Sequence, residues 1–90
     1  MTFALEYERT SKSRERFDKI AESVCAEQEV DQFVYLMANE HLLRFVSWFF
    51  RDVKRCMVFG LVGDWHRRLL DMPAFSWKAR GYQPLKTLFE

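Results

Sequence analysis

The chain has 90 residues, of which 49% are hydrophobic and 17% aromatic, and its formal net charge is +1. A chain of this length forms one domain, residues 1–90, and folding removes roughly 65% of its extended-chain surface from water. So small a core is not expected to hide all the apolar residues, and the small net charge excludes a strongly basic protein. We therefore expect part of the apolar surface to face a partner, and a homodimer is the simplest arrangement.

The first 38 residues predict an arm followed by two helices. Phe3, Leu5 and Tyr7 alternate as in a strand, but a lone strand would lack a partner, so residues 1–12 are expected to form an extended or flexible arm, or a first helical turn. Apolar residues with helical spacing then predict a helix over residues 14–28, with Ser13 as its N-cap. A second helix is predicted over residues 32–38, where the apolar residues again follow helical spacing. A single helix over residues 32–59 is the alternative, but a break at Asn39 is favoured because Asn is a good N-cap.

Residues 39–63 are the most apolar part of the chain, and they predict a central helix from Asn39 to Phe59, ended by Gly60. On a helical wheel, one apolar arc of roughly 160° exceeds the roughly 100° that a surface helix needs. The opposite arc is narrow and mostly basic. The residues of the apolar arc are Leu42, Leu43, Phe45, Val46, Phe49, Phe50, Val53, Cys56 and Met57.

The last part of the chain predicts a short helix over residues 65–72, stopped by Pro73, and a helical turn near residues 75–80. An irregular C-terminal tail follows Gly81. Together these elements predict an all-α fold, a small bundle of four to five helices around the central hydrophobic helix.

The histidines and cysteines do not predict a metal site. A zinc site needs donors in close pairs, because one short loop or one helical turn must direct two of them at the ion. In this chain the four candidate donors are each separated by many residues: Cys25, His41, Cys56 and His66. We therefore expect no bound metal and no cofactor.

No motif predicts a reaction. Cys56 lies in the apolar arc, where its thiolate is disfavoured. Asp52 lies at the edge of that arc, and Arg55 three residues later explains it as half of an ion pair. The sequence also lacks a glycine-rich phosphate loop, so we expect a protein that is not an enzyme.

The compartment is expected to be the cytoplasm. Both cysteines lie in apolar helical patterns, which predicts buried free thiols in a reducing environment. The N-terminus lacks the apolar core of a signal peptide, and charged residues interrupt residues 42–63, so no membrane span is expected.

Two clusters of aromatic and basic residues are candidate binding residues. Arg44, Trp48, Arg51 and Arg55 follow one another in steps of four, three and four, so they share one side of the predicted central helix. Cation–π contacts would hold such a cluster together, and Trp and Arg are enriched among residues that dominate binding energy. The alternative is that Trp48 packs inward against the C-terminal tail and the arginines lie along its rim.

The second cluster lies in the tail, where Trp77 and Tyr82 alternate with Lys78 and Arg80. Aromatic and basic residues mixed in this way could stack on bases and neutralise phosphates. The alternative is that the aromatic rings close one end of the core.

The sequence therefore predicts a small protein-binding module, an adaptor, regulator or stoichiometric inhibitor of a larger protein, of the kind found among accessory and phage-encoded proteins. It would act by occlusion or allosteric bias. The alternative is a nucleic-acid-binding protein that uses the basic and aromatic surface of the C-terminal half, for which binding would fall steeply with salt. The expected partner-binding residues are Arg44, Trp48, Arg51, Arg55, Trp77, Lys78, Arg80 and Tyr82.

Overall fold

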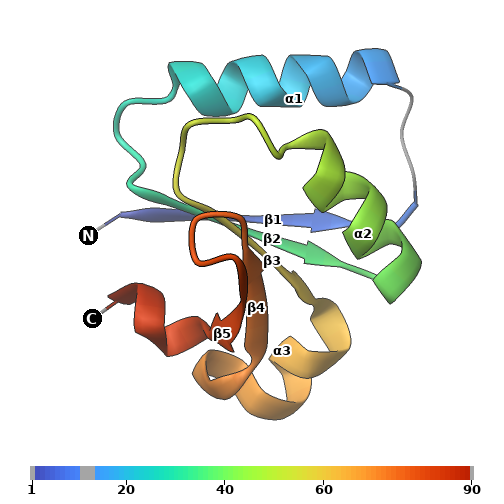
Figure 1. Cartoon of the computed structure of the whole chain (residues 1–90), viewed down its shortest axis with the longest axis vertical. Helices are drawn as coiled ribbons and strands as arrows, with labels where there is room; N and C mark the ends of the chain where they lie inside the picture. The colour runs from blue at the N-terminus through green and yellow to red at the C-terminus, as the bar shows by residue number, and fades with distance from the viewer. Residues whose placement is uncertain (1, 11–13, 90) are drawn as a thin grey trace.

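The computed structural model describes residues 2–10 and 14–89 and shows an α/β fold, a five-stranded mixed sheet with helices on both faces (Figure 1). The expected all-α bundle is therefore wrong. In chain order the elements are β1 (Phe3–Glu8), α1 (Arg14–Ala26), β2 (Gln32–Met37), α2 (Glu40–Phe49), β3 (Met57–Leu61), α3 (Val62–Arg68), the 3-10 turn η1 (Leu69–Asp71), β4 (Pro73–Ser76), β5 (Gly81–Pro84) and the 3-10 turn η2 (Leu85–Phe89).

The strands lie in the order β1-β2-β3-β4-β5. The first three are parallel, and β4 and β5 continue the sheet in antiparallel pairing, with Phe59 of β3 opposite Phe75 of β4. Helices α1 and α2 connect the parallel strands and cover one face of the sheet, whereas α3, η1 and η2 lie toward the other (Figure 1). The β4–β5 hairpin is thereby placed next to the strand on which α2 packs.

The first two strands show why the helical prediction failed. Residues 3–8 form the strand that their alternation indicates, because β2 supplies a parallel partner after one helical crossover. The segment from Phe33 to Met37 was expected to be helical. It is instead a strand buried on both faces, and such a strand presents a continuous apolar run that a buried helix also shows.

The predicted central helix is also wrong in its second half. Asn39 is the N-cap of α2, and its side-chain oxygen accepts a hydrogen bond from the backbone N–H of Leu42 at 2.9 Å. The helix ends at Phe49, and the chain then turns into β3. The apolar arc of the wheel thus combined residues of a ten-residue helix with Val53 and Cys56 of the connection that follows it and with Met57, the first residue of β3.

Two hydrophobic clusters fill the two sides of the sheet. Between the sheet and helices α1 and α2 lie, among others, Phe17, Val46 and Phe59, each with 0% exposure. The second cluster lies on the opposite face and consists of Val34, Leu36, Val58, Met72, Ala74 and Leu85. Alternate residues of β2 and β3 enter opposite clusters, as the pleat of a strand requires.

Other expectations have mixed outcomes. Cys25 and Cys56 are free thiols as expected, but neither is fully buried. Cys25 is exposed because α1 buries only a narrow stripe that includes Phe17 and Val24, and Cys56 is partly buried in the connection before β3. The expected N-cap Ser13 lies outside the described residues. Within residues 2–10 and 14–89, no helix combines the length and apolarity that crossing a membrane would need.

A buried polar pair links β1 to β2. The hydroxyl of Tyr35 donates to a carboxylate oxygen of Glu8 at 2.5 Å, and the two residues are 2% and 4% exposed. Burial, followed by the hydrogen bond and charge of Glu8, raises the pKa of Tyr35 far above its ordinary value. The hydroxyl therefore stays protonated and serves as a donor to the buried carboxylate.

Replacing Tyr35 by phenylalanine removes that donor while keeping the ring. We expect Tyr35→Phe to lower the free energy of unfolding by about 1–3 kcal/mol, because the carboxylate stays buried with one partner fewer. Urea unfolding followed by circular dichroism measures the loss. The matched control is Tyr82→Phe at an exposed position, where the change should stay within about 0.5 kcal/mol. Equal losses in the two variants would contradict the assignment.

Candidate functional site

A shallow groove of about 230 Å³ lies between α2 and the β4–β5 hairpin. Its position follows from the topology, since α2 packs on β3 and the hairpin continues the sheet from β3. Together with Arg51, which lies over one of its tryptophans, we call the groove the α2–hairpin surface. Its residues are Leu43, Arg44, Ser47, Trp48 and Arg51 from α2 and its C-terminal turn, and Phe75, Trp77 and Tyr82 from the hairpin.

Aromatic rings from both segments pack against one another in the groove. The ring centroids of Trp48 and Trp77 are 6.1 Å apart at an interplanar angle of 63°, and Phe75 lies 4.8 Å from Trp77 and 5.5 Å from Tyr82. The indole N–H of Trp77 donates to the backbone carbonyl of Ser47 at 2.7 Å. Edge-to-face pairs of this kind stabilise beyond their buried area, so the hairpin turn is fixed to α2.

Two arginines border the rings. The guanidinium carbon of Arg51 lies 4.2 Å from the centroid of the Trp48 ring, and the same side chain donates to the carbonyl oxygen of Trp48 at 3.0 Å. Arg44 pairs with Glu40 one turn earlier, at 3.1 Å. Both arginine side chains are exposed, so their charges are accessible to a partner.

The aromatic residues of the surface are unusually exposed. Trp48 is 58% exposed, Tyr82 56% and Trp77 38%, whereas large aromatic side chains in a folded protein are mostly buried on average. Trp48 contacts Trp77 of the tail and Arg51 lies over its ring, as the alternative expected, but Trp48 does not pack inward, because more than half of it stays exposed. Exposed rings gathered in one place are typical of an interaction site.

The remaining expected residues lie beside the groove or away from it. Lys78 and Arg80 belong to the hairpin turn. The backbone of Arg80 has a φ of 59°, a value that residues other than Gly, Asn and Asp rarely adopt. Arg55 donates to the backbone carbonyl of Val30 and lies over the ring of Phe33, so it links β3 to the start of β2. Arg55 is thus not part of the groove.

Sequence reasoning missed Leu43 and Ser47. Leu43 and Ser47 are four residues apart, like Arg44 and Trp48, so helical spacing places them on the neighbouring side of the same helix. Leu43 was assigned wholly to the core. Nothing local to either segment indicated that Trp48 and Trp77 meet.

Among the residues that the structure describes, no three His, Cys, Asp or Glu side chains gather where they could hold a metal ion. In comparisons with known proteins, no family model matched the chain, and no curated protein or solved structure matched it significantly. The geometry of the α2–hairpin surface is therefore the basis for a functional proposal.

Proposed function

We propose that this chain is a non-enzymatic protein-binding module that recognises its partner through the α2–hairpin surface. The observation that carries the proposal is the exposure of Trp48, Trp77 and Tyr82 in one cluster beside Arg44 and Arg51. Trp, Tyr and Arg are the residues most enriched among those that dominate the binding energy of protein interfaces.

The partner is expected to combine an apolar group with acidic residues. The groove is mostly apolar and small enough to take one or two side chains. The cations around it, Arg44 and Arg51 with Lys78 and Arg80 in the hairpin turn, favour carboxylates at the rim of the interface. An acidic segment with an aromatic or large aliphatic residue matches both features.

The surface is held in shape before a partner arrives. The Trp77–Ser47 hydrogen bond and the packed rings fix both segments, so little side-chain entropy remains to be lost on binding. Such a module acts by occluding its partner's surface or biasing its conformation, as an adaptor, regulator or inhibitor. We place this action in the cytoplasm, where the free thiols of Cys25 and Cys56 stay reduced.

Site-specific photo-cross-linking tests the proposal. A benzophenone amino acid placed at Tyr82 should give a defined protein adduct in a lysate of the source organism, and nuclease treatment should leave the adduct intact. The matched control carries the same amino acid at Leu70, which is 47% exposed in η1. An adduct that forms equally well from both positions would contradict the proposal.

A second candidate function, nucleic-acid binding, is favoured by a basic hollow next to Trp77. This hollow of about 370 Å³ is lined by cations on one side of the α2–hairpin surface: Arg51, Lys54, Arg55 and Lys78. If nuclease removes the Tyr82 adduct and affinity for a single-stranded oligonucleotide falls steeply with salt, this candidate replaces the first.

Self-association is a separate proposal, carried by β1. This strand forms one edge of the sheet, and Phe3, Leu5 and Tyr7 on the same face are about half exposed. An open edge strand with apolar side chains is a ready template for pairing with another strand. Two copies that pair through β1 around a two-fold axis would cover both edges and bring these apolar side chains of the two strands next to one another.

Light scattering at two protein concentrations checks this proposal. We expect the wild-type protein to have the solution mass of a dimer. Leu5→Lys should have the mass of a monomer, because the new charge would lie in the interface. Leu70→Lys, at an equally exposed position outside β1, should remain dimeric. A wild-type monomer at both concentrations would mean that β1 does not mediate self-association.

A further inference from the structure

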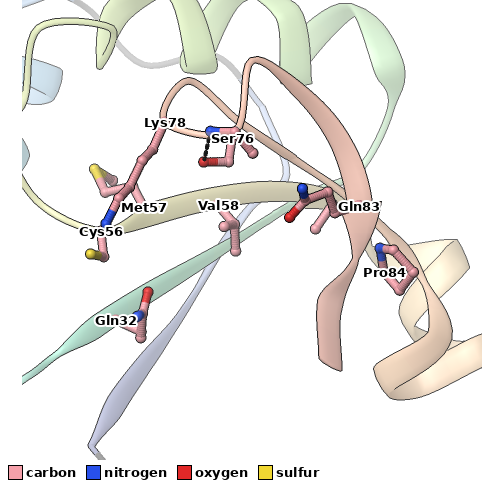
Figure 2. A pocket seen from close by; sticks show the side chains of 10 residues that line it. Gln32, Cys56, Met57, Val58, Ser76, Lys78, Gln83 and Pro84 are labelled. Carbon is pink, nitrogen blue, oxygen red and sulfur yellow. Dashed lines mark hydrogen bonds between the residues drawn. The ribbon is translucent and has the colours of Figure 1, made fainter. Parts of the chain in front are cut away.

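A second hollow lies on the sheet face opposite α1 and α2, away from the α2–hairpin surface. Its volume is about 360 Å³, at the low end of the range for small-molecule sites. The N-terminal ends of β2 and β3 form one side and the β4–β5 hairpin the other (Figure 2). The lining residues are Gln32, Cys56, Met57, Val58, Ala74, Ser76, Lys78, Ala79, Gln83 and Pro84.

The hollow exists because the sequence places small side chains there. Ala74, Ser76 and Ala79 contribute little volume. Met72 and Leu85, which are both buried, fill the same face of the sheet at the end of the hairpin away from its turn. Apolar walls from Val58 and Ala74, which belong to the cluster on this face of the sheet, give the space the character of a ligand pocket more than of a polar surface cleft.

One polar atom of the pocket lacks a partner. The side-chain oxygen of Gln32 is buried and accepts no hydrogen bond from any described group. A buried acceptor without a donor is costly, and native structures contain few of them. This oxygen therefore favours a ligand with an N–H or O–H donor at the β2 end of the pocket.

The other polar groups favour an anion. Among the described residues that line the pocket, Lys78 is the one that carries a full charge at neutral pH, and it extends from the hairpin turn toward the Cys56 end (Figure 2). The hydroxyl of Ser76 accepts from the backbone N–H of Ala79 at 3.3 Å, so its own hydrogen remains available to donate. The side-chain amide of Gln83 lies on the hairpin too, farther from its turn, in β5 (Figure 2).

We propose that this pocket binds a small organic monoanion that carries an O–H or N–H donor on a compact apolar body. Lys78 binds the negative charge, Gln32 accepts a hydrogen bond from the ligand's donor, and Val58 and Ala74 contact the apolar body. The pocket opens on the other face of the sheet from the α2–hairpin surface and shares Lys78 with the cations around that surface, whereas Gln32 belongs to the pocket alone.

NMR titration of the ¹⁵N-labelled protein tests the proposal with three probes. The first, 4-hydroxybenzoate, has both the charge and the donor; benzoate lacks the donor, and 4-hydroxybenzyl alcohol lacks the charge. We expect saturable shifts of the Gln32 side-chain amide and the Ala79 backbone amide, with 4-hydroxybenzoate binding about tenfold more tightly than either other probe.

Two variants separate the two contacts. Lys78→Met should lower the affinity for 4-hydroxybenzoate and for benzoate about tenfold and leave the affinity for 4-hydroxybenzyl alcohol unchanged. Gln32→Met should make 4-hydroxybenzoate bind no more tightly than benzoate. Lys54→Met, an exposed lysine outside the pocket, is the matched control and should bind like the wild type. The proposal is overturned if no probe saturates by about 10 mM, if the shifts cluster elsewhere, or if Lys78→Met binds all three probes normally.

Discussion

Replacing Phe17 by alanine should lower the free energy of unfolding by about 3–5 kcal/mol, the usual cost of truncating a buried phenylalanine. Phe17 is 0% exposed, and its ring centroid lies 5.3–6.3 Å from those of Phe45, Phe49 and Phe50 in α2. Apart from Val24, it is the one buried residue of α1 among those described. The loss should therefore appear both in urea unfolding and as faster amide hydrogen exchange throughout α1.

Phe45→Ala is the control for this prediction. Phe45 contacts Phe17 but is 47% exposed, so its truncation leaves a much smaller cavity. We expect a loss of about 1 kcal/mol or less. The half-buried Phe49 should give a loss between those of Phe45 and Phe17. A loss under about 1 kcal/mol for Phe17→Ala would mean that α1 is not held by this ring.

Replacing Trp48 by alanine should have the largest effect on function. Trp48 is 58% exposed before binding and carries both the Trp77 contact and the Arg51 stacking. We expect partner affinity to fall by about 2 kcal/mol or more, roughly 30-fold, because a partner would bury this ring most completely. Calorimetry with the partner identified by cross-linking measures the change.

The stability of Trp48→Ala should fall far less than that of Phe17→Ala, because so much of the ring is already in water. Leu70→Ala, which removes a similarly exposed apolar side chain from η1, should bind the partner like the wild type. Wild-type affinity in Trp48→Ala would remove the main support for the α2–hairpin surface.

Part of the fold could be predicted from local pattern. The helical spacing of Phe17, Ile20 and Val24 predicted α1, and Asn39 predicted the start of α2 through its capping side chain. The strands β2 and β3 were missed because a strand buried on two faces has no alternation to detect. The segments around Val34 and Val58 therefore read as helix. The helical turn near residues 75–80 and the irregular tail were also wrong, because these residues form β4, a turn and β5. The alternation in β1 was visible, but its partner appears only after a helical crossover.

The candidate site was predicted in two halves. Steps of three and four residues grouped Arg44, Trp48 and Arg51, of which the first two lie in α2 and Arg51 in the turn after it, and the tail was recognised as aromatic and basic. That Trp77 lies against α2 follows from the pairing of Phe59 with Phe75, a long-range contact with no local signature. Arg55 was misplaced because the predicted helix continued past the point where α2 ends.

The three tryptophans provide the most direct test that Trp48 and Trp77 form one binding surface. Each indole N–H gives its own signal in a ¹H–¹⁵N spectrum, and Trp65 packs on the opposite face of the sheet, where it serves as an internal control. The partner identified by cross-linking is added stepwise to the labelled protein. The indole signals of Trp48 and Trp77 should then shift with one common saturation curve, while the signal of Trp65 stays in place. A shift of Trp65 alone, or saturation of Trp48 and Trp77 at different partner concentrations, would contradict a single surface formed by α2 and the hairpin.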